Sequence, residues 1–342
     1  MIRLGIIGCG EITRLRHLPA AVGHPGVKVT ALTDSMVARA ECQKKHYGLT
    51  SYVAQDYKEV FGRVDAAINA LPNYLHVPVT LELLDAGIHV LCEKPLATDS
   101  KGAIACHRKA IENKLVLAVG MPRRFYESTA LMQLVLDERL LGPVEGYDWE
   151  YGMPFAWEAA STFYFSRSAA GGGVLLDEGV HLLDCLSQWF GPAYCVKYCD
   201  DNWGGVEANA QLFLRHTQSD ESISGRLRLS RTYALSNRLM VYGRDARAEI
   251  QRSDNAAVIL HRNIRGRDLT LRMRLSENRA VADPFFMELD NFVESIHGRS
   301  TPAVTAAQAA ETLTLIETCY SKAMPIAEPW VGNAPLISKV RA

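Results

Sequence analysis

Up to about residue 120, short apolar runs alternate with longer stretches in which apolar residues recur every three or four positions. Residues 2–7 form such a run, and it ends at a glycine, which is typical of a strand buried in a parallel sheet. The same pattern predicts strands at residues 27–33, 66–71, 89–92 and 115–119. Helical periodicity falls between them, through Leu18 and Ala21, over residues 77–86, and over residues 100–113 with Thr98 or Asp99 as the cap. This alternation predicts an α/β fold with a doubly wound parallel sheet.

From about residue 121 the rhythm changes, and polar and apolar residues alternate as they do in half-exposed antiparallel strands. The alternation predicts strands at residues 144–151, 193–199, 208–214, 222–230, 239–243 and 269–275, followed by helices at residues 285–296 and 305–323. A chain of 342 residues also favours two domains. We expect a Rossmann domain over residues 1–121, and over residues 122–342 an α+β domain with a large, mostly antiparallel open sheet.

Composition narrows the classes of function. Hydrophobic residues make up 48% of the chain and charged residues 22%, and the net charge of −1 favours neither nucleic acid nor a membrane surface as a partner. The apolar run at the start is too short for a signal peptide, and no later stretch approaches the ~20 apolar residues of a transmembrane helix, so a cytoplasmic protein is expected. The eight cysteines are scattered, and Cys195 and Cys199 have no second Cys or His pair at zinc spacing, so we expect free thiols and no metal.

A glycine-rich turn follows the first expected strand. Gly8 and Gly10 permit a tight turn and a close approach of the backbone to a pyrophosphate, at which the next helix would direct its free N–H groups. Asp34 lies 26 residues after Gly8, at the tip of the second strand, where an acidic residue bonds the adenosine ribose and repels a 2′-phosphate. Asp34 also fits a solvated loop or a helix cap, but the order of strand, turn, helix, strand and acid favours NAD, and Arg39 leaves NADP open. The cofactor contacts predicted in this part of the chain are Gly8, Cys9, Gly10, Glu11, Ile12, Asp34, Ser35 and Arg39.

Polar residues stand at the carboxyl ends of the later strands, where ligands of doubly wound sheets bind. They are Leu71-Pro72-Asn73 with His76 after one strand, Glu93-Lys94-Pro95 after the next, and Pro122-Arg123-Arg124 after the last. The lysine matters most, because an ammonium group in such a crevice stabilises a developing alkoxide and aids proton removal. An isolated lysine would be interpreted as a surface residue, so the functional interpretation of Lys94 depends on its place in the Glu93-Lys94-Pro95 motif.

Three glycines at residues 171–173 open the second group of polar residues. They let the chain pass close to a ligand before it enters a helix. Asp177, His181 and Asp184 then fall at i, i+4 and i+7, along one stripe of that helix. A carboxylate one turn from a histidine can orient the imidazole and hold its charged form, which suits general acid–base catalysis on an alcohol. A buried histidine satisfied by a neighbouring carboxylate is the alternative interpretation.

Four motifs, taken in order, resemble those of the glucose–fructose oxidoreductase/inositol dehydrogenase/MocA family of sugar and polyol oxidoreductases. They are Gly8-Cys9-Gly10, Leu71-Pro72-Asn73 with His76, Glu93-Lys94-Pro95, and Asp177 with His181 and Asp184, and the resemblance becomes looser after about residue 190. It implies hydride transfer between a nicotinamide cofactor and a secondary alcohol of a sugar, cyclitol or nucleotide sugar. It also implies that Lys94 contacts the substrate hydroxyl and the nicotinamide ribose, and that the open sheet supports a homodimer or homotetramer, as is common in such relatives.

The residues and the resemblance together predict a site. Lys94, Asp177 and His181 are the expected catalytic residues, and Arg123 and Trp157 join them as substrate residues. The remaining expected cofactor contacts are Leu71, Pro72, Asn73, His76, Glu93 and Lys94. Trp157 equally fits the core or an interface, and the arginine-rich stretch 215–279 fits either a charged substrate or a solvated sheet face. Two other functions stay open: an NAD-dependent glycosidase or epimerase that recycles its cofactor, and a sugar-sensing regulator without catalysis.

Overall fold

The computed structural model describes residues 1–158, 162–202, 205–218, 221–275 and 283–326. The chain forms two compact units, each with a sheet of its own. Unit 1 comprises Met1–Pro122, Glu158–Gly171 and Val281–Thr314, and unit 2 comprises Arg123–Trp157, Gly172–Ala280 and Leu315–Ala342. The predicted boundary between residues 121 and 122 lies one residue before the end of the first segment of unit 1. The prediction places the whole chain after residue 121 in the second domain, whereas residues 158–171 and 281–314 belong to unit 1.

Unit 1 contains a six-stranded sheet in which every neighbouring pair of strands is parallel. Its strands are β1 (Ile2–Ile7), β2 (Val27–Thr33), β3 (Tyr52–Ala54), β4 (Ala66–Asn69), β5 (His89–Glu93) and β6 (Leu117–Gly120), in the order β3-β2-β1-β4-β5-β6. The predicted doubly wound parallel sheet is confirmed, although the three residues of β3 are too few to show a period. The strand order reverses between β1 and β4, and ligands bind such sheets beyond the carboxyl ends of the strands at that point.

The helices of unit 1 connect these strands or come from later parts of the chain. They are a π-helical turn (Thr13–His17) that runs into α1 (Leu18–Gly23), then α2 (Val37–His46), α3 (Asn73–Asp85), α4 (Ser100–Glu112), α6 (Arg167–Ala170) and α8 (Pro284–Ile296). Asp99 caps α4 as predicted, since its carboxylate accepts a hydrogen bond from the N–H of Gly102 at 2.7 Å. Helix α3 begins four residues before the predicted start at residue 77, because the polar Asn73 and His76 of its first turn do not follow the apolar period.

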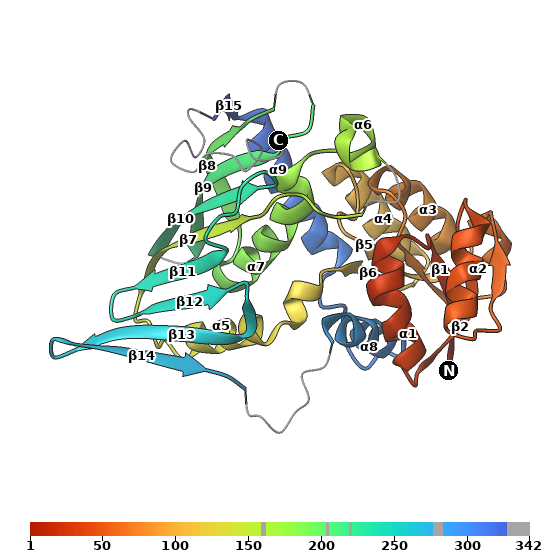
Figure 1. The fold of residues 1–342 in the computed structure, drawn as a ribbon, viewed down its shortest axis with the longest axis horizontal. Helices are drawn as coiled ribbons and strands as arrows, with labels where there is room; N and C mark the ends of the chain where they lie inside the picture. Colours follow the sequence, from red (N-terminus) through yellow and green to blue (C-terminus); the bar gives the residue numbers. More distant parts are fainter. Residues whose placement is uncertain (159–161, 203–204, 219–220, 276–282, 327–342) are drawn as a thin grey trace, which may run out of the picture. The chain divides into compact units, whose positions relative to one another are not determined.

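The core of unit 1 includes residues from far along the chain. Helices α1 and α8 lie side by side (Figure 1), and Leu289 and Phe292 of α8 are buried in the same apolar cluster as Leu18 of α1. The backbone is joined as well, because the N–H of Val119 in β6 donates to the carbonyl of Val304 at 3.1 Å. Burying one such large side chain contributes about 1.5–3 kcal/mol, so these contacts explain why the segment from residue 283 groups with unit 1.

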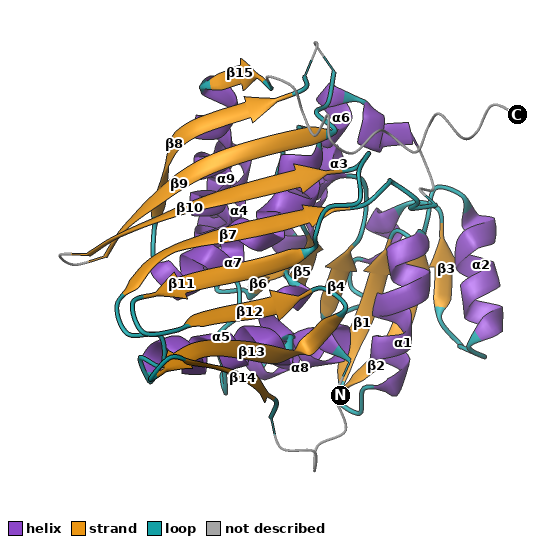
Figure 2. Ribbon diagram, turned by 60° about the vertical axis from the view of Figure 1, so that its left-hand side comes forward, coloured by secondary structure: helices purple, strands orange, loops and turns teal. Residues whose placement is uncertain are grey.

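Unit 2 is built on a nine-stranded sheet, which Figure 2 shows from its broad face. Its strands are β7 (Val144–Gly152), β8 (Ala193–Asp200), β9 (Asn209–Gln218), β10 (Glu221–Ser230), β11 (Arg238–Gly243), β12 (Arg247–Gln251), β13 (Asp254–Ile264), β14 (Arg267–Met273) and β15 (Ala323–Pro325), in the order β14-β13-β12-β11-β7-β10-β9-β8-β15. Neighbouring strands are antiparallel except β7 with β10 and β8 with β15, so the predicted mostly antiparallel sheet is confirmed. The strands β12 and β13 are missing from the prediction. In β13, the continuous apolar run at residues 256–260 fits a buried helix segment as well as a strand.

Aromatic stacks hold helix α7 (Val180–Phe190) against this sheet. The ring of Tyr147 in β7 lies 5.5 Å from that of Phe190, and the ring of Trp149 lies 5.9 Å from that of Trp189. Helix α5 (Glu127–Asp137) packs beside α7 and along β13, and α9 (Ala306–Ser321) has its first residues in unit 1 and its last in unit 2. The sheet therefore fixes α7, which carries part of the predicted site. No helix in the described part of the chain is long and apolar enough to cross a membrane.

Candidate active site

The turn after β1 requires glycine at its first position. Gly8 has φ +94°, and a Cβ atom there would lie 2.6 Å from the carbonyl oxygen of Ala70. Thr13 stands where the third glycine of the usual pattern would stand, and its hydroxyl donates a hydrogen bond to the carbonyl of Gly8 at 2.6 Å. The chain thus closes a tight turn, without a side chain at its first position, at the carboxyl end of β1.

Asp34 follows β2 and ties the strand to the glycine turn. One carboxylate oxygen accepts the N–H of Cys9 at 2.9 Å, and the other accepts the N–H of Met36 at 2.8 Å. The Nη1 atom of Arg39 lies 3.7 Å from the same carboxylate. Each carboxylate oxygen can accept more than one hydrogen bond, so Asp34 is held in place and can still accept a ribose hydroxyl. The geometry fits both interpretations of this residue, a cap of the loop before α2 and a ribose acceptor.

The other residues predicted near the pyrophosphate have different environments. Glu11 and Ile12 are half-buried, whereas Ser35 is exposed. Arg14 donates a hydrogen bond to Glu11 at 2.9 Å, and this bond lowers the pKa of Glu11. Gln43 of α2 donates a hydrogen bond to the carbonyl of Cys9 at 2.8 Å. The glycine turn is therefore supported by a helix that lies outside the glycine motif.

His76 joins two of the predicted motifs. It is 1% exposed, its Nδ1 lies 2.7 Å from the carbonyl oxygen of Pro95, and its Nε2 lies 2.6 Å from that of Leu71. Burial lowers the pKa of His76, although both carbonyl oxygens favour the protonated ring. Both ring nitrogens contact backbone carbonyls, so His76 links the loops after β4 and β5. Asn73, in the first of these loops, donates to the carbonyl of Ala170 at 2.8 Å.

Lys94 follows β5, and the preceding side chain fixes its backbone. One oxygen of Glu93 lies 2.7 Å from Nε2 of His17, and the other accepts the N–H of Lys94 at 3.1 Å. Burial alone would raise the pKa of Glu93, but the hydrogen bond to His17 and the charges of His17 and Lys94 outweigh burial and lower that pKa. Glu93 is therefore an ionised anchor, and Lys94 stands half-buried before the cis peptide bond to Pro95.

The charge of this anchor acts on a second buried carboxyl group, that of Glu288 in α8. Glu288 is 4% exposed. Burial and then the charge of Glu93 raise the pKa of Glu288 well above its usual value, by more than the nearby N–H of Met121 lowers it. Its buried surroundings therefore favour the protonated form. The sequence does not reveal it, because it occupies one polar position of an amphipathic helix.

In unit 2, the glycine run before α7 packs against two residues from distant parts of the chain. A Cβ atom on Gly172 would overlap the hydroxyl of Tyr320, and one on Gly173 would overlap the backbone of Glu207. The carboxylate of Glu207 accepts the N–H groups of Gly173 (2.8 Å) and Leu175 (3.0 Å) and the hydroxyl of Tyr320 (2.8 Å). Glu207 is fully buried, and burial raises its pKa against the effect of these donors. It fixes the start of the helical segment that carries the predicted acid–base residues.

Asp177 and His181 lie in consecutive parts of that segment. Asp177 is in a π-helical turn (Leu175–Gly179), and His181 is the second residue of α7, which continues from it. The prediction of one regular α-helical stripe is wrong in this turn, because a π-turn changes the angle between successive side chains. Asp177 forms an ion pair with Arg231, just after β10, which the sequence does not single out. His181 is 8% exposed.

Two adjacent arginines after β6 bind the same segment. Arg124 makes a buried, bidentate ion pair with Asp184, with Nε 2.5 Å from Oδ2 and Nη2 2.9 Å from Oδ1. Asp184 therefore has a structural role. The Nη2 atom of Arg123 lies 3.6 Å from Oε2 of Glu178, and its guanidinium carbon lies 4.5 Å from the centre of the Tyr151 ring. Arg123, a predicted substrate residue, is thus beside the π-helical turn.

The predicted residues fall into two groups. Unit 1 holds the glycine turn with Asp34, His76, Glu93 and Lys94, and unit 2 holds Arg123, Asp177 and His181. Trp157, the other predicted substrate residue, is 38% exposed at the end of a segment of unit 2. Within the described ranges, no group of three or more His, Cys, Asp or Glu side chains is arranged to hold a metal ion.

The strand order of unit 1, its glycine turn and the acidic residue after β2 are those of a dinucleotide-binding protein of the Rossmann class. Residues 2–121 match a family described as an oxidoreductase family with an NAD-binding Rossmann fold, and residues 155–327 match the C-terminal alpha/beta domain of that family. The chain therefore belongs to the glucose–fructose oxidoreductase/inositol dehydrogenase/MocA family, and the resemblance seen in its motifs is confirmed.

The individual relatives are named for activities on different sugars and on inositol. A dTDP-3,4-didehydro-2,6-dideoxy-alpha-D-glucose 3-reductase from Actinomadura kijaniata is 30% identical over 192 residues, which cover 56% of this chain and 56% of that protein. Inositol 2-dehydrogenase from Rhizobium meliloti is 28% identical over 183 residues, 54% of this chain and 53% of that protein. The chain thus spans about half the length of the curated relatives it matches. The crystal structure of KijD10, a 3-ketoreductase from Actinomadura kijaniata in complex with NADP and TDP-benzene, is similar with a TM-score of 0.83 and 23% identity over 96% of this chain and 99% of that one, which shows the fold.

Proposed function

We propose that this protein is an NAD(P)-dependent oxidoreductase that transfers a hydride between a secondary alcohol of a sugar, cyclitol or nucleotide sugar and a nicotinamide ring. Family membership supports the oxidoreductase part. The observation that carries the proposal is the fixed helical segment of unit 2 that carries Asp177 and His181. Asp177 is bound by Arg231 at the start of a helical segment that Glu207 fixes, and His181 follows it. These are the groups that proton transfer to or from an alcohol requires.

The residues of unit 1 fit a nicotinamide dinucleotide. The N–H of Cys9 is bonded to Asp34, so we assign the N–H groups of Gly10, Glu11 and Ile12 to the pyrophosphate and the remaining lone pairs of Asp34 to the ribose. The loops that His76 joins would border the nicotinamide half, through Leu71, Pro72, Asn73, Glu93 and Lys94. The acid after β2 favours NAD, and Arg39 and Ser35 beside it leave NADP possible. When bound, the nicotinamide supplies the hydride acceptor or donor.

We assign the proton to His181 and the charge stabilisation to Lys94. In the oxidation direction, His181 accepts the hydroxyl proton of the alcohol as the hydride leaves the carbon, and the ammonium of Lys94 stabilises the oxygen on which charge develops. Asp177 stabilises the protonated imidazole, and Arg231 holds Asp177 in place. Reduction uses the same groups in reverse. Lys94 and His181 belong to different units, so their pairing rests on the family resemblance.

The relatives support a sugar-like substrate. One acts on a dTDP-linked deoxysugar, another on inositol, and the KijD10 crystals contain TDP-benzene together with NADP. A secondary alcohol, or the ketone derived from it, is common to the two named activities. Nucleotide sugars and free polyols both remain within the proposal, as do both directions of hydride transfer.

Substitution of the two assigned residues tests the proposal. Lys94→Ala and His181→Ala are expected to lower kcat by about 10²–10⁴-fold and to leave NADH affinity nearly unchanged. Reduction of NAD+ and NADP+ is followed at 340 nm across polyols, sugars and nucleotide sugars, and NADH binding by its fluorescence. Lys45→Ala and His46→Ala, at exposed positions of α2, are the matched controls. Near-native turnover in either active-site variant contradicts the assignment.

The same assay separates the other two functions. NADH that accumulates in step with product indicates a dehydrogenase, whereas product formed without net NADH indicates an epimerase or glycosidase that recycles its cofactor. A protein that binds NADH and sugars but turns over none of them is the sugar-sensing regulator.

We also propose that the chain self-associates through the broad sheet of unit 2 as a homodimer or homotetramer. Apolar side chains stand exposed on its strands, with Val196 50% and Leu271 58% exposed. Sedimentation velocity measures the assembly, and a monomer at micromolar concentration contradicts it. We place the enzyme in the cytoplasm, which fits the burial of seven of its eight free cysteines.

A further inference from the structure

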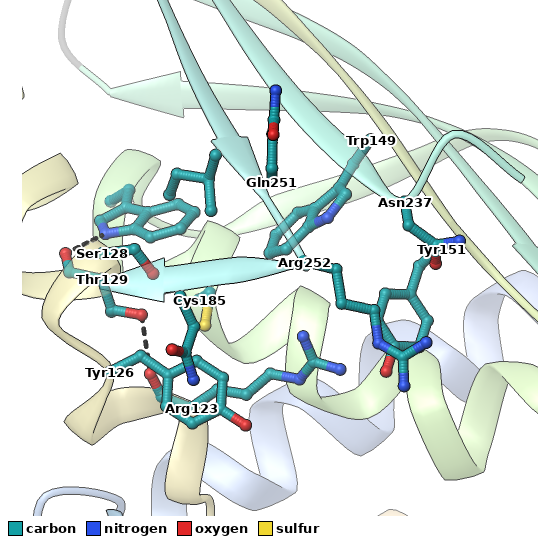
Figure 3. A pocket seen from close by; sticks show the side chains of 13 residues that line it. Arg123, Tyr126, Ser128, Thr129, Trp149, Tyr151, Cys185, Asn237, Gln251 and Arg252 are labelled. Carbon is teal, nitrogen blue, oxygen red and sulfur yellow. Dashed lines mark hydrogen bonds between the residues drawn. The ribbon is translucent and has the colours of Figure 1, made fainter. Parts of the chain in front are cut away.

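A cavity of about 170 Å³ lies within unit 2, between the sheet and helices α5 and α7 (Figure 3). The indole rings of Trp149 and Trp189 form part of its wall. Arg123 and Arg252 both extend toward the ring of Tyr151, one from the turn before α5 and the other from the turn between β12 and β13. The cavity therefore brings together two cationic side chains that lie far apart in the sequence.

The charges around this cavity are unbalanced. Its lining contains two arginines and no aspartate or glutamate. The guanidinium carbons of Arg123 and Arg252 lie 4.5 Å and 4.8 Å from the centre of the same Tyr151 ring. Both guanidinium groups are therefore beside one ring, and like charges repel. An anion between or beside them would remove this repulsion.

The arginines also have unused hydrogen-bonding capacity. Arg123 has a side chain that is only 16% exposed, and its carboxylate neighbour Glu178 is 3.6 Å away, beyond the usual hydrogen-bond distance. Arg252 is exposed, its Nη1 contacts the sulfur of Met153, and no ion pair with a carboxylate is seen for it among the residues that the structure describes. A guanidinium carries five N–H donors, and a largely buried one is costly without acceptors. Tyr126 and Asn255 add a hydroxyl and an amide to the lining.

The cavity continues along the face of α7 that carries the proposed acid–base residue. Cys185 and Trp189 line it, and they follow His181 by four and eight residues, so the three side chains lie on one side of the helix. Four residues of helix rise by about 6 Å, which is close to the length of one sugar ring. At about 170 Å³ the cavity is smaller than the roughly 300–1,000 Å³ that encloses a whole drug-sized ligand. It fits one charged group of a substrate rather than a complete nucleotide.

We propose that this cavity is an oxyanion subsite, which binds the carboxylate or phosphate group of a sugar substrate through Arg123 and Arg252. The inference rests on the proposed function, because it names the substrate class of the same active site. The planar guanidinium groups suit an oxyanion, which can accept two parallel N–H bonds from each. The neighbouring indoles exclude water and strengthen these charge-assisted bonds.

Binding can be measured without turnover, because two tryptophans line the cavity. Intrinsic tryptophan fluorescence is titrated with glucuronate, glucose 6-phosphate and glucose at constant ionic strength. We expect at least one of the two anions to bind, and glucose to bind at least tenfold more weakly. Arg252→Met is expected to weaken anion binding about tenfold or more, and Arg252→Lys to restore part of it, since a charge-assisted hydrogen bond is lost and then partly regained. Arg262→Met, an exposed arginine of β13 outside the cavity, is the matched control.

Three binding results would overturn the subsite. They are binding of neither anion at millimolar concentration, equal binding of glucose, and an equal effect of Arg262→Met and Arg252→Met. Glucuronate and glucose 6-phosphate tested separately show whether the site prefers a carboxylate or a phosphate. If anions bind through Arg252 but no sugar is turned over, the proposed function fails and the subsite stands. If Lys94 and His181 prove essential for turnover while Arg252→Met changes no KM, the subsite fails and the function stands.

Discussion

Replacing Glu207 by glutamine would keep the shape of a buried side chain and change one of its two acceptor oxygens into a donor. Oε1 accepts the N–H of Leu175 and the hydroxyl of Tyr320, and Oε2 accepts the N–H of Gly173. With the amide oxygen in the Oε1 position, the new NH2 group faces the N–H of Gly173, so one charge-assisted hydrogen bond is lost. That loss is about 1.5–3 kcal/mol of unfolding free energy.

The loss of unfolding free energy can be compared across three variants. A loss of 1.5–3 kcal/mol corresponds to a fall in Tm of roughly 3–12 °C for a domain of this size. Glu207→Ala removes the acceptor of the two backbone N–H groups of Gly173 and Leu175, at about 1–3 kcal/mol each, so its effect is expected to be larger than that of Glu207→Gln. Tyr320→Phe removes one donor and leaves Glu207 with both backbone N–H groups, so it is expected to cost no more than about 1.5 kcal/mol.

Differential scanning calorimetry measures the Tm of each variant, and steady-state kinetics measures its kcat and KM. Because Glu207 fixes the start of the segment that carries Asp177 and His181, Glu207→Gln is expected to lower kcat more than it raises the KM for NAD. Tyr320→Phe serves as the conservative comparison. If Glu207→Gln melts within a degree of the unmodified protein and turns over at the same rate, the argument that this carboxylate supports the acid–base residues is refuted.

Two further predictions concern unit 1. Asp34→Ala is expected to weaken NADH binding about tenfold and to shift preference toward NADPH, because the ribose acceptor and the charge that opposes a 2′-phosphate are both removed; an unchanged ratio of the two dissociation constants contradicts this. Glu288 has a folded-state pKa above its ordinary value of 4.5, so its contribution to stability is complete below about pH 4.5 and is lost as the pH rises through the folded pKa. Glu288→Gln cannot ionise, so its Tm relative to the unmodified protein is expected to be higher at pH 8 than at pH 5, and an equal difference at both pH values contradicts the buried, protonated acid.

The sequence predicts much of unit 1 because its strands are short, apolar and separated by helices of regular period. The bounds of β1 and β2 coincide with the predicted runs, and Asp99 caps α4 as its position suggests. The limits appear where a short apolar run does not tell a strand from a helix. The strand β13 is such a case, because its run at residues 256–260 fits either and no regular alternation of strands and helices surrounds it.

The candidate site divides in the same way. Gly8, Asp34 and Lys94 carry local signals, since each stands at the end of a predictable strand. Glu207 and Arg231 carry none, because their partners in the segment before α7 lie more than thirty residues away along the chain. Such long-range pairs depend on how the sheet strands are ordered in space, which a single sequence does not specify.

His76 shows what a recognised motif leaves unspecified. The motif predicts a cofactor contact, and the structure adds that both ring nitrogens are directed at carbonyl oxygens of the two neighbouring loops. Those loops are close because β4 and β5 are adjacent in the sheet. The protein contacts of the histidine therefore follow from strand order, which the motif does not give.

Arg123 and Arg124, which are neighbours in the chain, contact Glu178 and Asp184, which are six residues apart on one helical segment. Six residues of helix rise by about 9 Å, so the segment is clamped at two separated points by one short turn. A slip of the helix by a single residue would rotate both carboxylates by about 100° and break both contacts. The clamp thus sets the rotational phase of α7, and with it the direction in which His181 projects. Substitutions between the two points can be absorbed by local packing, but an inserted or deleted residue there would turn the histidine away from its direction in the native helix.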